Sequence, residues 1–214
     1  LKSLFILSII SLLADEIWAA NVDFDATIAQ LGLKDNVTTD WSDSAEIKLP
    51  EPTLAYVNIL SPEQVMPQTP QDLHDVEVEM YDGQGNYFCK RAVTHAQGST
   101  SLSFEKKNFA ANFCDDEWLE KATPNIKFGH WVGQDAFHFK AYWIDAYRGL
   151  GNVCYQLYDQ MTESRGEAIW QRVGHDGEHN KAKCYPMGFP CVVYLNGKFE
   201  GVFVWQLKKH RKNM

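Results

Sequence analysis

The stretch of this sequence best suited to binding an anion runs from Gln97 to Phe109. Its small residues can present backbone N–H groups and hydroxyls with little steric bulk, and two lysines follow them, which suits phosphate oxygens. The predicted phosphate-contacting residues are Gly98, Ser99, Thr100, Ser101, Lys106 and Lys107. The alternative is a hairpin turn followed by a solvated basic edge, because the G-x-x-x-x-G-K-[ST] spacing of a phosphate-binding loop is absent.

Two histidines and two cysteines in the last quarter of the chain have side chains that can bind zinc. They are His175, His179, Cys184 and Cys191. Their spacing matches no standard zinc finger, and only the two histidines share one short polar loop. A zinc-dependent hydrolase is therefore the least favoured of the three functional hypotheses.

Composition limits both the fold and the partners. The chain has 214 residues, of which 45% are hydrophobic, so it can form one sizeable core and not two comfortable ones. Its net charge of −8 argues against a general electrostatic grip on nucleic acid. The number of cysteines is odd and no C-x-x-C pair occurs, which favours buried free thiols over a complete set of disulfides. The five cysteines are Cys89, Cys114, Cys154, Cys184 and Cys191.

The N-terminal residues have the order of a secretory signal. Lys2 precedes the apolar run Leu4–Leu13, and the small pair Ala19–Ala20 follows. The apolar run is too short to span a bilayer as a helix, so residues 1–20 predict export, to the medium or the cell envelope, without a stable membrane span. The acidic and polar residues 21–53 predict an N-terminal arm, which leaves 54–214 as the folded domain.

Strand patterns dominate that domain. Val76–Tyr81 alternates apolar and acidic residues and predicts one strand of a hairpin, and Asn196–Gly197 between two β-rich runs predicts a tight type I′ hairpin. Gly201 within the last run predicts a bulge or a close backbone approach. Apolar residues of Asp145–Met161 recur every three or four positions and predict a helix with one buried face. The expected fold class is α+β, a mostly antiparallel sheet with one long packed helix.

The order of these features resembles the CotH spore-coat kinase family over about residues 54–214. The features are the lysine-bearing loop, the strand Phe137–Ala141, the helix that follows Asp145, and the Leu195–Asn196–Gly197 hairpin. The resemblance implies the N-terminal lobe of an atypical protein-kinase-like fold, which transfers phosphate from ATP to exported proteins with a divalent cation such as Mg²⁺. It implies that Lys107 or Lys106 meets the nucleotide phosphates beneath the small-residue loop.

The sequence departs from that family in two places. Many family members have Arg-Asn early in the helix where this chain has Gly151–Asn152, and Arg148 is the candidate substitute. The chain also ends at Met214, where the family enters a second lobe that carries the metal-binding carboxylates. The resemblance therefore implies an inactive fragment whose partners are the nucleotide, an exported protein substrate and the missing second lobe.

An exported, non-catalytic β-rich binding or structural module is the alternative from another functional class. It is motivated by the aromatic content, which includes seven tryptophans and nine tyrosines. Tryptophans exposed together on one face would favour binding, whereas buried ones would belong to the core. The tryptophans that decide between these outcomes are Trp118, Trp131, Trp143, Trp170 and Trp205.

Overall fold

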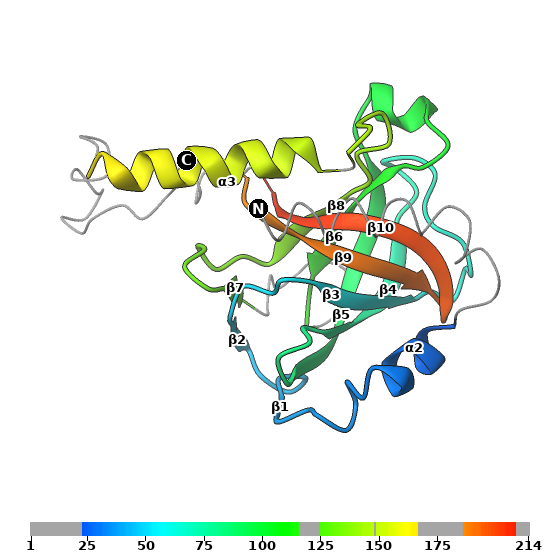
Figure 1. The fold of residues 1–214 in the computed structure, drawn as a ribbon. Coiled ribbons are helices and arrows are strands. Elements are labelled where there is room, and N and C mark those ends of the chain that lie inside the picture. The colour runs from blue at the N-terminus through cyan, green and yellow to red at the C-terminus, as the bar shows by residue number, and fades with distance from the viewer. Residues whose placement is uncertain (1–22, 116–124, 148, 167–185, 209–214) are drawn as a thin grey trace.

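The computed structural model describes residues 23–115, 125–147, 149–166 and 186–208, and Figure 1 shows their arrangement. The N-terminal elements are α2 (Phe24–Gln30), β1 (Thr39–Asp40), β2 (Glu46–Leu49), β3 (Ala55–Leu60), β4 (His74–Tyr81) and β5 (Asn86–Gln97). The remaining elements are the 3₁₀ turn η1 (Thr100–Ser103), β6 (Asn108–Phe113), β7 (Asn125–Phe128), β8 (Ala136–Lys140), α3 (Leu150–Ser164), β9 (Gly188–Leu195) and β10 (Lys198–Leu207).

Seven of the described strands close into a barrel. Their order is β5–β4–β3–β9–β10–β8–β6, and β6 pairs back onto the C-terminal half of β5. The neighbours in this ring are antiparallel except β3 and β9, which run parallel. Short β1 adds to the other end of β5, and β2 pairs with β7 as a separate two-stranded sheet (Figure 1).

Aromatic side chains fill the interior of the barrel. Trp205 on β10 is fully buried, and its ring centroid lies 4.9–6.3 Å from those of the surrounding phenylalanines. Those phenylalanines are Phe88, Phe113, Phe128, Phe137, Phe139 and Phe189. Phe128 comes from β7, so the small sheet contributes to the same core. Edge-to-face and stacked ring contacts add to the free energy gained from burying the rings.

The expected fold class is wrong. The chain is mostly β and closes a barrel, where the prediction was a kinase-like α+β lobe with a long packed helix. Because a barrel interior is filled by residues from its own strands, it leaves no open sheet face for a helix to cover. The helix face predicted to be buried is exposed instead, and its residues are Ile144, Tyr147, Leu150, Cys154, Leu157, Tyr158 and Met161.

The helix also begins later than Asp145. The Asp145 carboxylate accepts hydrogen bonds from the backbone N–H groups of Tyr147, Gly149 and Leu150, at 3.0, 3.0 and 2.6 Å. It therefore satisfies donors that a helix start leaves without partners. Gly151 lies in the first turn, where an added Cβ would come within 3.0 Å of the Tyr142 ring. The start of the helix thus packs closely against Tyr142 at Gly151.

The C-terminal hairpin forms as predicted. Asn196 and Gly197 have φ angles of 48° and 82°, the two positive values that a type I′ turn requires. The pairing of β9 with β10 shifts register between Phe199 and Gly201, which confirms the bulge expected at this glycine. The bulge places Gly201 next to the side chain of Lys106.

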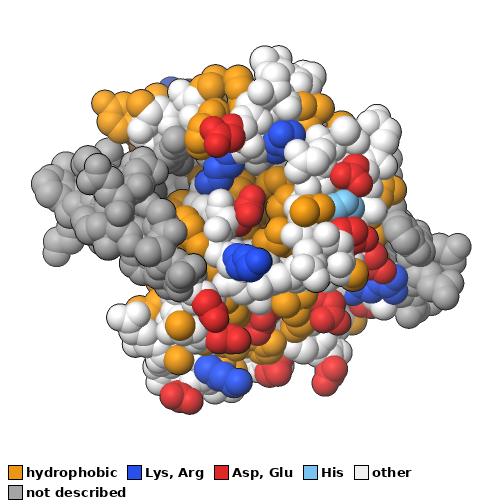
Figure 2. Space-filling model, turned by 90° about the vertical axis from the view of Figure 1, so that its right-hand side faces the viewer, with side chains coloured by type: hydrophobic (Ala, Val, Ile, Leu, Met, Phe, Trp, Pro, Cys, Tyr) orange, Lys and Arg blue, Asp and Glu red, His pale blue; other side chains and the backbone are white. Residues whose placement is uncertain are grey.

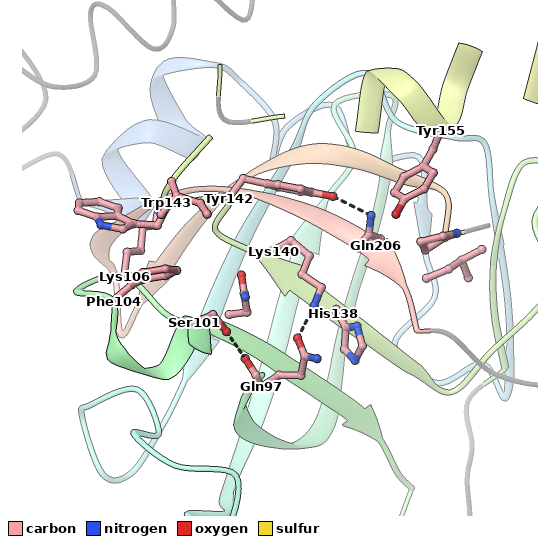
Figure 3. Close-up of a pocket in the computed structure, with 14 residues that line it drawn as sticks. Gln97, Ser101, Phe104, Lys106, His138, Lys140, Tyr142, Trp143, Tyr155 and Gln206 are labelled. Carbon is pink, nitrogen blue, oxygen red and sulfur yellow. Dashed lines mark hydrogen bonds between the residues drawn. The ribbon is translucent and has the colours of Figure 1, made fainter. Parts of the chain in front are cut away.

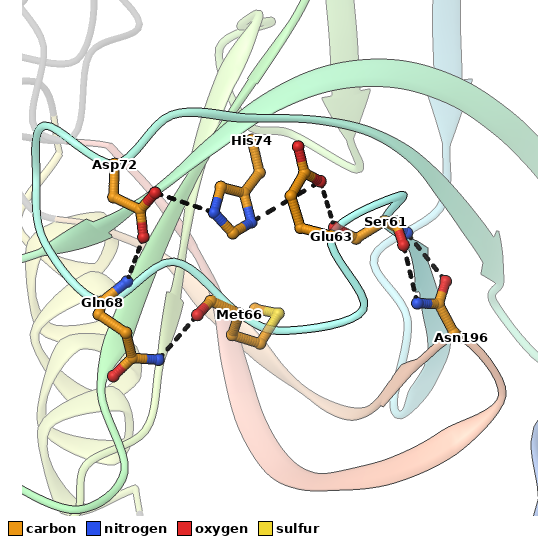
Figure 4. Close-up of polar contacts among 7 residues, drawn as sticks. All are labelled: Ser61, Glu63, Met66, Gln68, Asp72, His74 and Asn196. Atoms are coloured by element: carbon orange, nitrogen blue, oxygen red, sulfur yellow. Dashed lines mark hydrogen bonds and ion pairs between the residues drawn. The ribbon is translucent and has the colours of Figure 1, made fainter.

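The turn of that hairpin is tied to the connection between β3 and β4 (Figure 4). The Asn196 side chain accepts from the backbone N–H of Ser61 at 2.9 Å and donates to its carbonyl at 2.8 Å. Nearby, buried His74 lies 3.0 Å from Asp72 and 4.0 Å from Glu63. These contacts hold a proline-containing segment against the barrel although it has no regular secondary structure.

The described part of the N-terminal arm packs onto the barrel. Phe24 and Ile28 of α2 are buried against Tyr81 and Tyr194, and Asp23 caps the helix through the N–H groups of the first turn. The predicted signal residues 1–20 lie outside the described residues. None of the helices that the structure describes is long and apolar enough to cross a membrane.

Charges of both signs are mixed on the surface seen in Figure 2, which is the side of the barrel to the right in Figure 1. Acidic and basic side chains both lie there among exposed apolar atoms. Such a mixture gives this face no single-sign field that would steer a polyanion.

We expect Trp205→Ala to lower the free energy of unfolding by about 3–5 kcal/mol, because it removes the ring that the other core rings surround. Trp143→Ala is the matched control, since Trp143 is 37% exposed and its loss should cost less than about 1 kcal/mol. Urea denaturation followed by circular dichroism measures both values. Equal losses for the two variants would contradict the role of Trp205.

Candidate functional site

A cavity of about 470 Å³ lies between the outer surface of the barrel and the segment that leads into α3. Figure 3 shows its lining, which comes from β5, β6, β8, β10 and the residues after β8. The polar lining residues are Gln97, Ser101, Lys106, Asn108, His138, Lys140, Tyr142 and Gln206. The apolar lining residues are Phe104, Trp143, Ile144, Tyr155, Pro186 and Leu207.

Strand alternation explains why this cavity is polar. Phe137 and Phe139 of β8 point into the aromatic core, so His138 and Lys140 point to the opposite, outer face. On β10, Trp205 points inward and its neighbour Gln206 points outward. The same strands therefore build the core with one set of residues and the cavity with the other.

Lys106 reaches the cavity because Gly201 leaves space for it. Its Nζ donates to the carbonyl of Val202 at 2.8 Å and lies 4.1 Å from the centroid of the Phe203 ring. A Cβ on Gly201 would lie only 2.3 Å from this Nζ, and the φ of +138° is one that other residues rarely adopt. The glycine bulge thus positions a cation, as the close approach predicted at Gly201 required.

Lys140 brings a positive charge into the cavity beside the imidazole of His138. Lys140 donates a hydrogen bond from its Nζ to Oε1 of Gln97 (Figure 3). The pKa of His138 is lowered to about 3, first by burial and then by the positive charges of Lys140, Lys208 and His95. His138 is therefore neutral at pH 7. The same charges that oppose its protonation favour an anion bound next to it.

Tyr142 has a backbone conformation that is rare for a bulky side chain. Its φ is +46°, and its hydroxyl accepts a hydrogen bond from Nε2 of Gln206 at 3.0 Å. Figure 3 shows this pair across one side of the cavity. Strained backbone of this kind clusters at ligand sites, so Tyr142 supports a functional interpretation of the cavity.

The structure brings only part of the predicted phosphate-contacting set together. Ser101 and Lys106 line the cavity. Gly98 has a φ of +118°, and a Cβ at this position would clash with the Ser101 hydroxyl. Ser99 precedes η1, and Thr100 is its first residue. Ser101 Oγ donates to the carbonyl of Gln97, so the segment forms a short helical turn and not an open anion-binding loop.

Two other predicted residues do not contribute to the described lining. Lys107 Nζ donates to the carbonyl of Phe104 at 3.3 Å, and it is not among the described residues that line the cavity. Arg148 lies outside the described residues. Lys140, His138, Tyr142 and Gln206 were not predicted, although the alternation of the strand at 137–141 placed His138 and Lys140 on one face.

The described residues give little support to the predicted zinc site. Cys191 is buried in β9, where burial raises the pKa of its thiol, and His175, His179 and Cys184 lie outside the described ranges. No group of three potential metal ligands occurs among the described residues. Cys89, Cys114, Cys154 and Cys191 are free thiols.

Of the tryptophans that could mark a binding face, Trp131 and Trp205 are core residues and Trp143 is exposed beside the cavity. Trp118 and Trp170 lie outside the described part of the chain. Only one of these tryptophans is exposed in the described part of the chain, so the described residues do not form the aromatic face that the binding-module hypothesis expects. The cavity is the observation that supports that hypothesis.

Comparison of the chain with models of known protein families and with curated proteins finds no match. The resemblance to the CotH family therefore stays a prediction.

We expect His138→Asn to reduce the loss of stability on acidification. The lowered pKa means that the unfolded state takes up the His138 proton first, so this group destabilises the fold increasingly as pH falls from about 6.5 towards 3. Above pH 6.5 it makes no pH-dependent contribution. Urea denaturation of wild type and variant between pH 7 and pH 4 measures the difference.

The control is His95→Asn, because His95 lies on β5 and is not among the described residues that line the cavity. A wild-type pH dependence that survives unchanged in His138→Asn would contradict the assignment of a neutral, buried imidazole to this site.

Proposed function

We propose that the protein is a β-barrel binding module that holds a small anionic ligand against the outer face of β8 and β10. The observation that supports this most strongly is the pair of lysines, Lys106 and Lys140, in one cavity. No aspartate or glutamate is among the described residues that line it, although the chain as a whole has a net charge of −8. A local positive site on an acidic protein selects anions by charge.

The rest of the lining indicates what kind of anion fits. Side-chain amides of Gln97, Asn108 and Gln206 can hydrogen-bond several ligand oxygens, and the aromatic rings of Trp143 and Tyr155 offer flat apolar surfaces. The volume falls within the range of small-molecule sites. A compound that combines a phosphate or carboxylate with a planar ring suits this lining, and a nucleotide is one such compound.

Phosphoryl transfer from ATP is the second hypothesis, and Lys106 in the cavity is the observation that favours it. Transfer requires Mg²⁺ held by carboxylates and a residue that positions the acceptor hydroxyl. The described lining provides lysines, amides and aromatic rings, so within that part of the chain the geometry supports binding better than transfer. Export of the protein and an exported protein substrate remain predictions of the sequence.

We expect Lys140→Gln to weaken binding of ATP by about 10-fold or more, because a charge-assisted hydrogen bond contributes about 1.5–3 kcal/mol. Lys198→Gln, an exposed lysine at the start of β10, is the charge-matched control and should leave affinity unchanged. Isothermal titration calorimetry with ATP, inorganic phosphate and adenosine measures the affinities. Adenosine should bind much more weakly than ATP because it lacks the anionic group.

Two results would refute the proposed function. One is the absence of binding by any anion in a wider panel of nucleotides, sugar phosphates and aromatic carboxylates. The other is an anion that binds Lys140→Gln and Lys106→Gln as tightly as wild type.

We expect Gly201→Ala to weaken anion binding because the new Cβ displaces the Lys106 ammonium from its place above Phe203. A double-mutant cycle tests this mechanism directly. In a Lys106→Ala background, Gly201→Ala should cause no further loss of affinity. Additive losses would show that Gly201 acts through the backbone and not through Lys106.

A further inference from the structure

The polar outer wall of the barrel extends beyond the residues that line the cavity. On β6, Phe109 and Ala111 belong to the core, so the alternate residues Ala110 and Asn112 lie on the outer face. Backbone pairing aligns these outward residues with those of β5 and β8 in rows that cross the strands. The wall therefore consists of successive rows, and the cavity covers only part of them.

The middle row contains the histidine of the cavity. His95 of β5, Ala110 of β6, His138 of β8 and Gln206 of β10 pair with one another in this order. His138 is 9% exposed and lines the cavity, and its ring nitrogens make no hydrogen bond to any described residue (Figure 3). A neutral imidazole has one N–H donor and one acceptor nitrogen, so His138 offers both to a ligand.

The rows on either side of His138 each contain a lysine. Lys140, two residues along β8, donates from its Nζ to Oε1 of Gln97. Lys208, which directly follows β10, belongs to the row on the other side because β8 and β10 are antiparallel. Its Nζ donates to Oδ1 of Asn112 at 3.1 Å. Both lysines therefore extend along a row to a side-chain amide.

A small residue allows Lys208 to reach Asn112. Ala136 of β8 pairs with Asn112, and the register of β8 with β10 places Lys208 on the other side of Ala136. A methyl group leaves room for the lysine chain to cross it. Asn112 is itself held in place, since its Nδ2 donates to the carbonyl of Val93 at 3.3 Å. Asn112 thus positions the Lys208 ammonium.

The charges along this wall are of one sign. The pKa of His138 is lowered first by burial and then by three positive neighbours, which places all three near its ring: Lys140, Lys208 and His95. The described residues of the middle row and of the row through Asn112 include no aspartate or glutamate between β5 and β10. Where the Asn112 row continues onto β4 it reaches Asp75, which pairs with Arg91.

We propose that Lys208 and Asn112 form a second anion subsite, which we call the Lys208 subsite, and that the ligand is an elongated molecule with an anionic group at each end. The inference rests on the proposed function, which assigns one anionic group to Lys106 and Lys140. On β8 the rows of Lys140 and Lys208 are four residues apart, about 13 Å along the strand. A diphosphate cannot span this separation, whereas an extended sugar bisphosphate or a longer chain approaches it. His138 lies between the subsites and can donate to an oxygen of the linking part.

Isothermal titration calorimetry of the full chain with octylphosphonate and octylene-bisphosphonate tests the second subsite. The two compounds share one apolar chain and differ in the second anionic group. We expect the bisphosphonate to bind wild type at least about 10-fold more tightly, because two linked groups engage two subsites at once. Lys208→Gln should remove this gain and leave the affinity for octylphosphonate unchanged.

Three controls separate the subsites. Lys208→Arg keeps the charge and should keep most of the gain. Lys198→Gln changes the charge of an exposed lysine at the start of β10 and should leave both affinities unchanged. Pyrophosphate is too short to reach both lysines, so it should bind Lys208→Gln as tightly as wild type. Circular dichroism checks that each variant is folded.

The outcomes distinguish this inference from the proposed function. If octylphosphonate binds through Lys140 and the second phosphonate adds no affinity, the Lys208 subsite is refuted while the cavity proposal stands. A gain that persists in Lys208→Gln refutes the assignment to Lys208. If neither these compounds nor any other anion binds wild type, both proposals are wrong.

Discussion

The pairing of β6 back onto β5 is the constraint on which the rest of the structure depends. It closes the barrel, and closure divides the residues of every strand into an inner set and an outer set. The inner set is aromatic and gathers around Trp205. Those rings occupy the part of the interior that the structure describes, and the polar side chains of the candidate site project from the outer face.

The same constraint accounts for the position of the helix. A sheet with one open apolar face would have drawn the apolar stripe of α3 onto it, as in the α+β arrangement expected from the sequence. The closed barrel offers α3 a polar outer wall, and the helix meets it with Asn152, Tyr155 and Asp159. The apolar stripe is left facing away from the barrel. The polar cavity and the exposed apolar stripe of α3 thus both follow from closure.

Local backbone features such as turns and bulges could be predicted from this sequence, whereas the pairing of strands distant in the chain could not. Asn196–Gly197 required a type I′ turn and Gly201 required a close approach, because few alternatives satisfy those backbone positions. The parallel pairing of β3 with β9 joins segments more than 130 residues apart, and no local pattern specifies it. Helical periodicity showed that α3 has an apolar face but could not show which surface that face meets.

The candidate site was predictable to a similar extent. Lys106 and Ser101 were identified because lysines and small polar residues near a turn suit an anion. Lys107 could not be separated from Lys106, since adjacent residues of an extended segment point in opposite directions and only the register decides between them. Lys140 and His138 lie on a strand whose alternation was visible. Their role emerged only when the fold brought β8 beside β6 and β10 and placed α3 over them. Tyr155 in the cavity wall and exposed Leu157 are two residues apart on one helix, so α3 presents one side to the cavity and another side away from the barrel.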